Sequence, residues 1–342
     1  MEARIIDRSA IVMQSPLEAQ FVPSPLKFAG PGTNHLLVQT EYSVISAGTE
    51  LAVYQGLESW APLPFIPGYG SVGRVLEVGD SISGIVPGDR VFTFGSHASI
   101  NLITEGVVVK TPDSVPAYLL PLAIRMGEIA TTSLRVSSAE LGDFVAVQGL
   151  GLVGNLAAQQ FKLAGCKVIG IDVSAKRLDA ARACGIDLLI NSAEEDAAAA
   201  VRKITGGEMS QVVVEATGLP TLAGIAIDFA AVGGELILLG SPRGKYEGSA
   251  TPLLWKVHEA KTNVTLKGAH EWSLPIKPTP GIKHSMERNA KMLIDLLVSG
   301  NLHVKELITH IVKPIDAPFV YKELYGRNDN YFGVIIDWTD EK

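Results

Sequence analysis

The pattern of hydrophobic and polar positions differs between two parts of the chain. Residues 1 to about 120 contain short apolar runs such as "HLLVQTEYSVI", "GSVGRVLEVG" and "RVFTFG", separated by glycine, proline and aspartate. Runs rich in β-branched and aromatic residues between such turn signals are typical of strands. We therefore expect this part of the chain to form a mostly β domain.

From about residue 125 the texture changes. Apolar runs such as "FVAVQG", "KVIGID" and "QVVVEATG" alternate with helical patterns such as "NLAAQQFKLAG" and "AKRLDAARACG". Strands this apolar are buried on both faces, which predicts a parallel, doubly wound α/β sheet. After about residue 270 come a proline-rich connection, a helical pattern in "SMERNAKMLIDLLVSG" and a final strand in "YFGVIIDW".

Composition narrows the possible partners. The 342 residues are 47% hydrophobic and carry a net charge of −7 without a basic block, so we expect a small-molecule ligand and neither nucleic acid nor a membrane. No apolar run approaches the roughly 20 residues that span a bilayer, and "MEARIIDRSA" lacks a signal-peptide layout. Two cysteines, Cys166 and Cys184, cannot build a disulfide framework. These features predict a cytoplasmic protein.

The strongest local motif lies in "FVAVQGLGLVGNLAAQQFKLAGCKVIGID". Gly149 permits a tight turn, Gly151 lets the backbone approach a pyrophosphate, and Gly154 lets the following helix pack close to the sheet. Leu152 and Val153 complete the turn, at the positive N-terminus of that helix. The motif predicts a dinucleotide-binding loop, with a glycine-rich turn that binds nothing as the alternative.

Asp172, at the end of the next strand, is expected to accept hydrogen bonds from the adenosine ribose. A carboxylate there repels a 2′-phosphate, so the predicted cofactor is NAD. Arg177 lies five residues further on and could tolerate a phosphate; alternatively, it is a solvated helix residue.

The whole chain resembles the medium-chain dehydrogenase/reductase family in "VISAGTEL", "PGYGSVGRVLEVG", "VPGDRV", "VVVEATG" and "GGELILLGSP". The resemblance implies a GroES-like, mostly β catalytic domain at 1–124, a Rossmann NAD-binding domain at 125–270 and a C-terminal segment, 271–342, that returns to the catalytic domain. It also places Thr217 and Gly240 at the cofactor.

The family's usual zinc ligands are missing. The segment that resembles Cys-Gly-Thr/Ser-Asp reads Ala-Gly-Thr-Glu at residues 47–50, and the one that resembles Gly-His-Glu reads Gly-Tyr-Gly at 68–70. The third ligand position falls on Arg125, which repels zinc. "RVFTFGSHASINLI" contains none of the cysteines of the family's structural zinc lobe. We therefore expect no metal site.

Without zinc, side chains must handle the proton and the developing charge. The resemblance brings Tyr69 and Arg125 to the vacated metal site, where the guanidinium would lower the phenol's pKa. Thr49 matches the hydroxyl residue that passes the proton in zinc-dependent relatives, and His97 is a further candidate base. The alternatives are that Tyr69 only fills space, that Arg125 pairs with Glu50 or Glu128, and that His97 is an exposed loop residue.

The predicted activity is zinc-independent, NAD-dependent hydride transfer at a secondary alcohol or its ketone, the alcohol being a sugar, a cyclitol or a ring-bearing hydroxyl compound. The "SAGTE" segment and the missing zinc lobe resemble the bacteriochlorophyllide dehydrogenase-like subgroup. The alternatives are a quinone or enoyl reductase that uses NADPH, and an inactive dinucleotide-binding sensor. The runs "ELILLG" and "NVTLKGA" suggest a homodimer formed through sheet edges.

Overall fold

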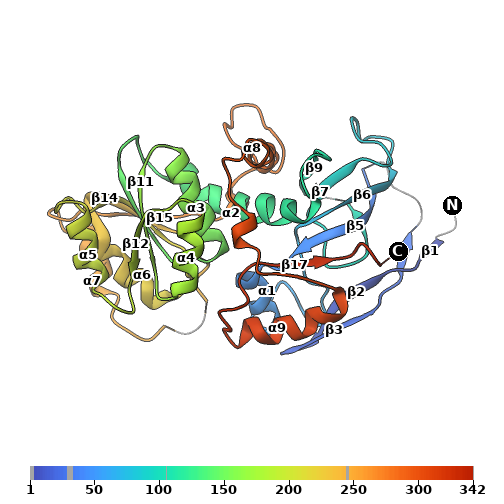
Figure 1. The fold of residues 1–342 in the computed structure, drawn as a ribbon, viewed down its shortest axis with the longest axis horizontal. Helices are drawn as coiled ribbons and strands as arrows, with labels where there is room; N and C mark the ends of the chain where they lie inside the picture. The colour runs from blue at the N-terminus through green and yellow to red at the C-terminus, as the bar shows by residue number, and fades with distance from the viewer. Residues whose placement is uncertain (1–3, 29–33, 105, 244–245, 342) are drawn as a thin grey trace. The chain divides into compact units, whose positions relative to one another are not determined.

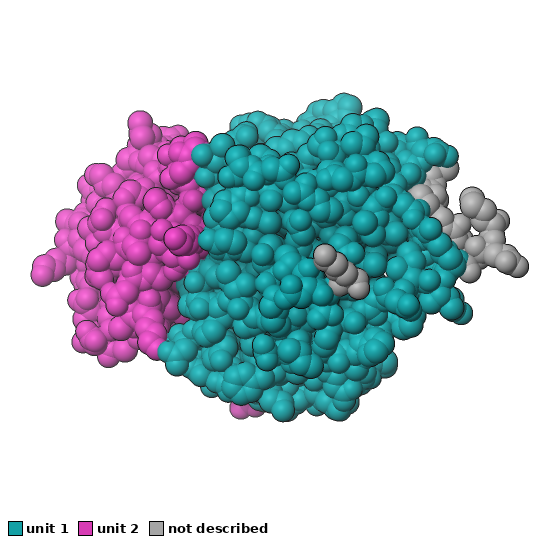
Figure 2. All heavy atoms as spheres, turned by 45° about the vertical axis from the view of Figure 1, so that its right-hand side comes forward, with its two compact units in different colours: residues 1–125, 274–298, 308–342 teal, residues 126–273, 299–307 magenta. Residues whose placement is uncertain are grey.

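The structure is a computed structural model that describes residues 4–28, 34–104, 106–243 and 246–341. The chain forms two compact units, which Figure 2 colours separately. Unit 1 comprises Met1–Arg125, Leu274–Val298 and Ile308–Lys342, and unit 2 comprises Met126–Ser273 and Ser299–Leu307. The C-terminal segment, which the sequence analysis assigned as a whole to the first domain, is thus divided between the two units.

Unit 2 contains a six-stranded sheet in which all neighbouring strands are parallel, in the order β12-β11-β10-β13-β14-β15. The strands are β10 (Phe144–Gln148), β11 (Lys167–Asp172), β12 (Leu188–Asn191), β13 (Ser210–Glu215), β14 (Ala230–Leu238) and β15 (Thr265–Gly268). The direction of chain progression reverses between β10 and β13, and such a switch point opens a ligand crevice at the carboxyl ends of the strands. The predicted doubly wound parallel sheet is confirmed.

Helices cover both faces of this sheet, with α3 and α4 on one face and α5 to α7 on the other (Figure 1). The helices of unit 2 are α2 (Gly127–Val136), α3 (Leu152–Leu163), α4 (Ala175–Ala183), α5 (Ala197–Ile204), α6 (Pro220–Ala226) and α7 (Thr251–His258). Local sequence sets two of their starts, since Ser174 caps α4 and Asp196 caps α5 through side-chain oxygens. Ile169, Val213 and Leu236 are fully buried in a core to which α5 and α7 contribute side chains.

Unit 1 contains a seven-stranded sheet in the order β16-β17-β5-β6-β7-β9, with β8 also paired to β5. Its strands are β5 (Leu36–Val44), β6 (Ser71–Val78), β7 (Arg90–Thr93), β8 (Ile100–Ile103), β9 (Val108–Lys110), β16 (His310–Val312) and β17 (Val334–Asp337). Two smaller pairs are β1 (Arg4–Ile6) with β4 (Leu26–Phe28) and β2 (Ser9–Ser15) with β3 (Glu18–Pro23). The predicted mostly β texture is confirmed.

Among the described residues of unit 1, the α-helices are α1 (Ala47–Tyr54), α8 (Met286–Val298) and α9 (Ala317–Tyr325). In unit 1, short 3-10 turns occur at Ala117–Leu119 and Pro314–Asp316, and a π-helical turn, η2, at Leu122–Met126. In unit 2, 3-10 turns occur at Ile227–Phe229, Glu271–Ser273 and Lys305–Leu307. Helices α1 and α9 pack together, with the rings of Tyr54 and Tyr321 stacked 5.7 Å apart in a core that includes Trp338. Both helices supply residues to the site described below.

Within the described residues, no helix is both long enough and apolar enough to cross a membrane. Cys166 and Cys184 are both buried and free, and burial raises the pKa of the Cys184 thiol to about 12.

Candidate functional site

The glycine turn of unit 2 brings the end of β10 against the end of β13. Gly149 has a φ of +90°, and a Cβ built on it would lie 2.6 Å from the Cγ2 atom of Thr217. Glycine alone satisfies both the left-handed backbone and this approach. Thr217, which the family resemblance placed at the cofactor, therefore lies directly beside the glycine turn.

Two further glycines allow close backbone packing around the crevice. A Cβ on Gly154 would lie 1.8 Å from the carbonyl oxygen of Gly149, so α3 can approach the sheet only with glycine there. A Cβ on Gly240 would lie 2.2 Å from the amide nitrogen of Gly218. Any larger residue at either position would therefore clash with the backbone of a neighbouring segment.

The N-terminus of α3 fits an anionic group. Gly151 is its N-cap and provides no side-chain cap, and a Cβ built on Gly151 would meet no atom within 4 Å. Leu152 and Val153 form its first turn. Uncapped amide groups and open space above a glycine are what a pyrophosphate needs, so the residues present fit a nicotinamide dinucleotide.

Asp172 ends β11 and is tied to the same turn. Its Oδ2 atom accepts from the amide of Leu150 at 2.7 Å, and its Oδ1 atom accepts from the amide of Ser174 at 2.9 Å. The Arg177 guanidinium lies 3.9 Å from Oδ2. Asp172 thus orders the glycine loop, a task that the sequence analysis did not foresee, and each carboxylate oxygen retains a second lone pair.

Glu215 is a buried carboxylate at this crevice that the sequence analysis missed. It accepts from the amide of Thr217 at 2.8 Å, from the Thr217 hydroxyl and from the amide of Gly218 at 3.2 Å. Burial raises the pKa of Glu215, and these hydrogen bonds oppose the shift. The signal in the sequence was an acidic residue at the end of an otherwise apolar strand, just before Thr-Gly.

In unit 1, a cationic side chain lies between two aromatic rings. The guanidinium carbon of Arg125, in turn η2, lies 4.5 Å from the ring centroid of Tyr69 and 4.6 Å from that of Phe94. Arg125 is only 1% exposed. A Cβ on Gly70 would lie 2.8 Å from the Arg125 Cβ, so the glycine after Tyr69 makes room for the arginine.

The phenol of Tyr69 is held by hydroxyl groups. Its O–H donates to the Oγ atom of Ser46, and a side-chain hydrogen bond from Thr49 also acts on it. Burial raises the pKa of Tyr69 above its ordinary value, and the charge of Glu50 adds to this; Arg125, Ser46 and Thr49 lower it. The expected lowering by Arg125 is therefore present but outweighed, because burial is the larger effect. The phenol keeps its proton at neutral pH.

His97 lies fully buried behind this cluster. Its Nε2 atom is 3.0 Å from Oε2 of Glu50, and its Nδ1 atom is 2.8 Å from Oγ of Ser43. The indole N–H of Trp338 donates to the same Ser43 oxygen at 2.9 Å. The alternative of an exposed loop histidine is wrong, because β5, α1 and the end of β17 enclose the ring.

Glu50 is the centre of the buried network. Its Oε1 atom accepts from the amide of Ser46 at 2.8 Å, and its Oε2 atom accepts from the hydroxyl of Tyr321 besides facing His97. Its side chain is 2% exposed, and a buried carboxylate needs such donors. The sequence analysis found Tyr69, Thr49 and Arg125, which the fold brings together, but it missed Ser46 and Tyr321.

These residues do not fit a zinc site. An alanine, a phenol and a guanidinium stand at residues 47, 69 and 125, and none of these groups matches the thiolate and imidazole ligands of zinc. Across residues 4–28, 34–104, 106–243 and 246–341, no three His, Cys, Asp or Glu side chains are grouped to hold a metal ion.

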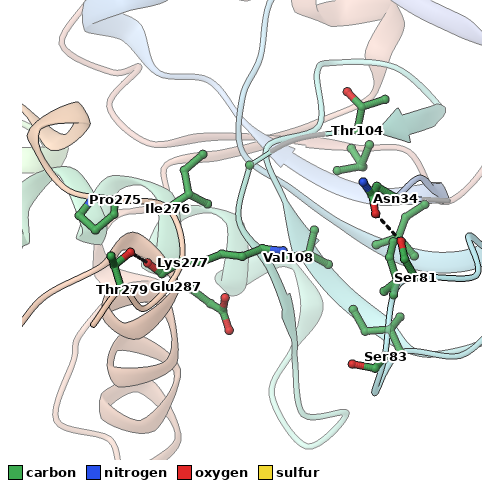
Figure 3. A pocket seen from close by; sticks show the side chains of 15 residues that line it. Asn34, Ser81, Ser83, Thr104, Val108, Pro275, Ile276, Lys277, Thr279 and Glu287 are labelled. Carbon is green, nitrogen blue, oxygen red and sulfur yellow. Dashed lines mark hydrogen bonds between the residues drawn. The ribbon is translucent and has the colours of Figure 1, made fainter. Parts of the chain in front are cut away.

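Unit 1 also has a cavity of about 760 Å³. Ser81 and Ser83 lie on one side of it, and Thr279 and Glu287 lie on the other (Figure 3). Its described lining includes none of the residues that the sequence predicted for catalysis. This cavity is therefore separate from the Tyr69 cluster.

Comparison with known families matches both parts of the chain. Residues 32–113 match the alcohol dehydrogenase GroES-like domain, which confirms the GroES-like prediction. Residues 153–274 match the zinc-binding dehydrogenase model.

Individual relatives span most of the chain. An uncharacterized zinc-type alcohol dehydrogenase-like protein of Haemophilus influenzae is 25% identical, over 95% of this chain and 97% of that protein. The D-guloside 3-dehydrogenase of Escherichia coli K12 is 27% identical, over 75% of this chain and 73% of that enzyme. The solved structure of an Escherichia coli oxidoreductase/dehydrogenase of unknown specificity shares the fold, with a TM-score of 0.81 at 19% identity over 97% of this chain and 99% of that chain. The chain belongs to the medium-chain dehydrogenase/reductase family of oxidoreductases, whose dehydrogenases use a nicotinamide dinucleotide.

Proposed function

We propose that this protein is an NAD-dependent dehydrogenase that interconverts a secondary alcohol and its ketone without zinc. The observation that carries the proposal is the cluster of Tyr69, Ser46 and Arg125 in the segments where the family resemblance places metal ligands. A half-buried phenol beside a buried guanidinium supplies a proton donor and a positive charge at the substrate oxygen. Zinc meets the same need in the related enzymes as a Lewis acid that stabilises the alkoxide.

In ketone reduction, Tyr69 donates its phenolic proton to the substrate oxygen. The raised pKa of Tyr69 suits this direction because the proton remains available at neutral pH. The phenolate that results is stabilised by the Arg125 charge and by hydrogen bonds from Ser46 and Thr49, all of which lower the phenol pKa. A nicotinamide dinucleotide held at the Gly149–Gly154 turn would supply the hydride in this direction and accept it in the reverse one. In alcohol oxidation the phenolate takes the proton back. We place His97 behind this cluster, as part of the network that holds it.

The preference for NAD rests on Asp172. A carboxylate at the end of the second strand of such a sheet favours ribose hydroxyls and repels a 2′-phosphate. Arg177 lies 3.9 Å from that carboxylate and reduces the repulsion. We propose that NAD binds more tightly than NADP. The substitution Asp172→Ala should reduce the difference between the affinities for the two cofactors.

For the substrate we propose a sugar, a cyclitol or a ring-bearing hydroxyl compound. The similar D-guloside 3-dehydrogenase is named for a sugar derivative, which supports this class. The test is a panel of alcohols, sugars, cyclitols and ketones, followed by NADH and NADPH absorbance. Turnover of a sugar or cyclitol with NAD would support the proposal. Reduction of a quinone or enone with NADPH would instead show a quinone or enoyl reductase. Cofactor binding without any turnover would favour an inactive dinucleotide-binding sensor.

We also propose that two copies associate through β15 (Thr265–Gly268). This strand is an edge of the six-stranded sheet, and its Leu266 is 39% exposed. Exposed edge strands are templates for pairing with another chain. Light scattering at micromolar concentration should give a dimer mass, and a monomer mass would refute this.

A further inference from the structure

Ser46 occupies a helix-capping position without capping the helix. It is the N-cap of α1, but its side chain makes no capping hydrogen bond. A serine in this position ordinarily accepts a hydrogen bond from an amide of the first turn, which stabilises the helix. Here the hydroxyl instead accepts the O–H of Tyr69. The hydroxyl is thus directed at the phenol rather than at its own helix.

The backbone of Ser46 is held from both sides. Its amide donates to the Glu50 carboxylate at 2.8 Å, and its carbonyl oxygen accepts from the Glu50 amide at 2.9 Å. Glu50 is in turn fixed by Tyr321 and His97, which are both fully buried. Ser46 itself is 6% exposed. A side chain on so constrained a backbone presents its hydroxyl in one place.

We propose that Ser46 is a positioning residue for Tyr69, which aims the phenol and stabilises it as a phenolate. In the resting arrangement the phenol donates to Ser46 Oγ. When the Tyr69 O–H bond breaks and a new O–H bond forms on the substrate oxygen, the Ser46 hydroxyl turns its own hydrogen toward the phenolate. No proton leaves Ser46 in this step. The inference rests on the proposed role of Tyr69.

Several charged and titratable groups face the Tyr69 oxygen. Arg125 lies against the ring from turn η2, and the charge of Glu50 on α1 raises the pKa of Tyr69. The charge of Tyr69 in turn raises the pKa of Tyr321 on α9. Thr49 provides the other hydroxyl. A test of Ser46 must therefore separate its contribution from theirs, which requires changing Ser46 alone and observing Tyr69 directly.

The first measurement is the titration of Tyr69 by NMR of protein with ¹³C-labelled tyrosine rings, using Tyr69→Phe to assign its signal. Ser46→Ala should move this titration to higher pH, because the phenolate loses a hydrogen-bond donor. No substrate or cofactor is needed, so the result stands even if the proposed reaction is wrong. An unchanged Tyr69 titration in folded Ser46→Ala protein would overturn the proposal.

Matched variants address folding. Ser46→Cys keeps the side-chain size with a weaker donor and should shift the titration less than Ser46→Ala does. Asp196→Ala removes a true cap, whose Oδ1 accepts from the amides of Ala198 at 2.9 Å and Ala199 at 3.1 Å, and should lower the midpoint of urea denaturation. Ser46→Ala should lose less, because it removes no cap. If Ser46→Ala lost stability like Asp196→Ala while leaving Tyr69 unchanged, its role would be structural only.

The second measurement is kinetic, on whichever substrate the panel identifies. Ser46→Ala should lower kcat about tenfold with KM nearly unchanged. The double variant Ser46→Ala/Tyr69→Phe should be no slower than Tyr69→Phe alone, because Ser46 acts through the phenol. Additive losses would contradict the proposal.

Discussion

The two candidate sites are built in opposite ways. The candidate dinucleotide site of unit 2 is made largely of backbone, with Gly149, Gly151 and Gly154 in one short stretch. The Tyr69 cluster of unit 1 is made of side chains from Ser46 to Tyr321. A site made of backbone can be recognised in the sequence from glycines at a fixed spacing. A site made of side chains cannot, because the role of each residue depends on its tertiary contacts.

The largest predicted effect tests the side-chain site. Tyr69→Phe removes the hydroxyl and keeps the ring stacked on Arg125, so the protein should fold normally. Its turnover number should fall by about 10²-fold to 10⁴-fold, as for loss of one proton-transfer group. NADH affinity, measured by fluorescence titration, should stay unchanged. A turnover number within about twofold of wild type would leave Tyr69 with a packing role only.

The second prediction concerns the network behind Tyr69. Glu50→Ala removes the acceptor of three buried donors and should lower the free energy of unfolding by about 3–5 kcal/mol in urea denaturation. The control is Glu287→Ala, whose ion pair with Lys291 is at the surface and should contribute less than about 0.5 kcal/mol. Similar losses for both variants would show that the Glu50 network is not a stabilising centre.

The third prediction separates two glycines of the backbone site. Gly151→Ala adds a methyl group that meets no protein atom within 4 Å, so stability should be unchanged while NADH affinity falls about tenfold or more. Gly154→Ala places the methyl 1.8 Å from a carbonyl oxygen, so thermal unfolding should shift downward as well. If the Gly151→Ala variant bound NADH as tightly as the wild-type protein, the pyrophosphate could not lie at this turn.

The smallest predicted effect is a shift in pH dependence. Arg125 lowers the pKa of Tyr69, opposing burial and Glu50, so Arg125→Met should raise that pKa. Ketone reduction needs the protonated phenol, so the pH at which the rate of reduction declines should be higher in the variant. Alcohol oxidation needs the phenolate, so the pH at which the rate of oxidation rises should also be higher. Rate profiles that stay in place, or move downward, would contradict the electrostatic role of Arg125.

The fold was largely predictable because its signals are local. The apolar runs around "FVAVQG" and "KVIGID" became β10 and β11, and the glycine motif forms the turn between β10 and α3. Helices α1 and α9 were not predicted. Their sequences, "AGTELAVY" and "APFVYKELY", contain glycine or β-branched and aromatic residues that favour helix weakly, and tertiary packing overrides that preference.

The missed helices explain the missed site residues. Tyr321 was missed together with α9. It meets Glu50 of α1, which the sequence analysis named only as a possible partner of Arg125, across 271 positions of sequence. Ser46 was missed because its contact with Tyr69, 23 positions further along the chain, depends on tertiary structure. The net pKa shift of Tyr69 also required the structure, since residue identity reveals the nearby cation but not the extent of burial that outweighs it.

The central claim is that side chains take the place of zinc in this protein. The most direct measurement is zinc content by elemental analysis together with turnover, on one preparation before and after exhaustive chelation. The account predicts far less than one zinc per chain and an unchanged turnover number after chelation. About one zinc per chain, with activity lost on chelation and restored by zinc, would contradict it.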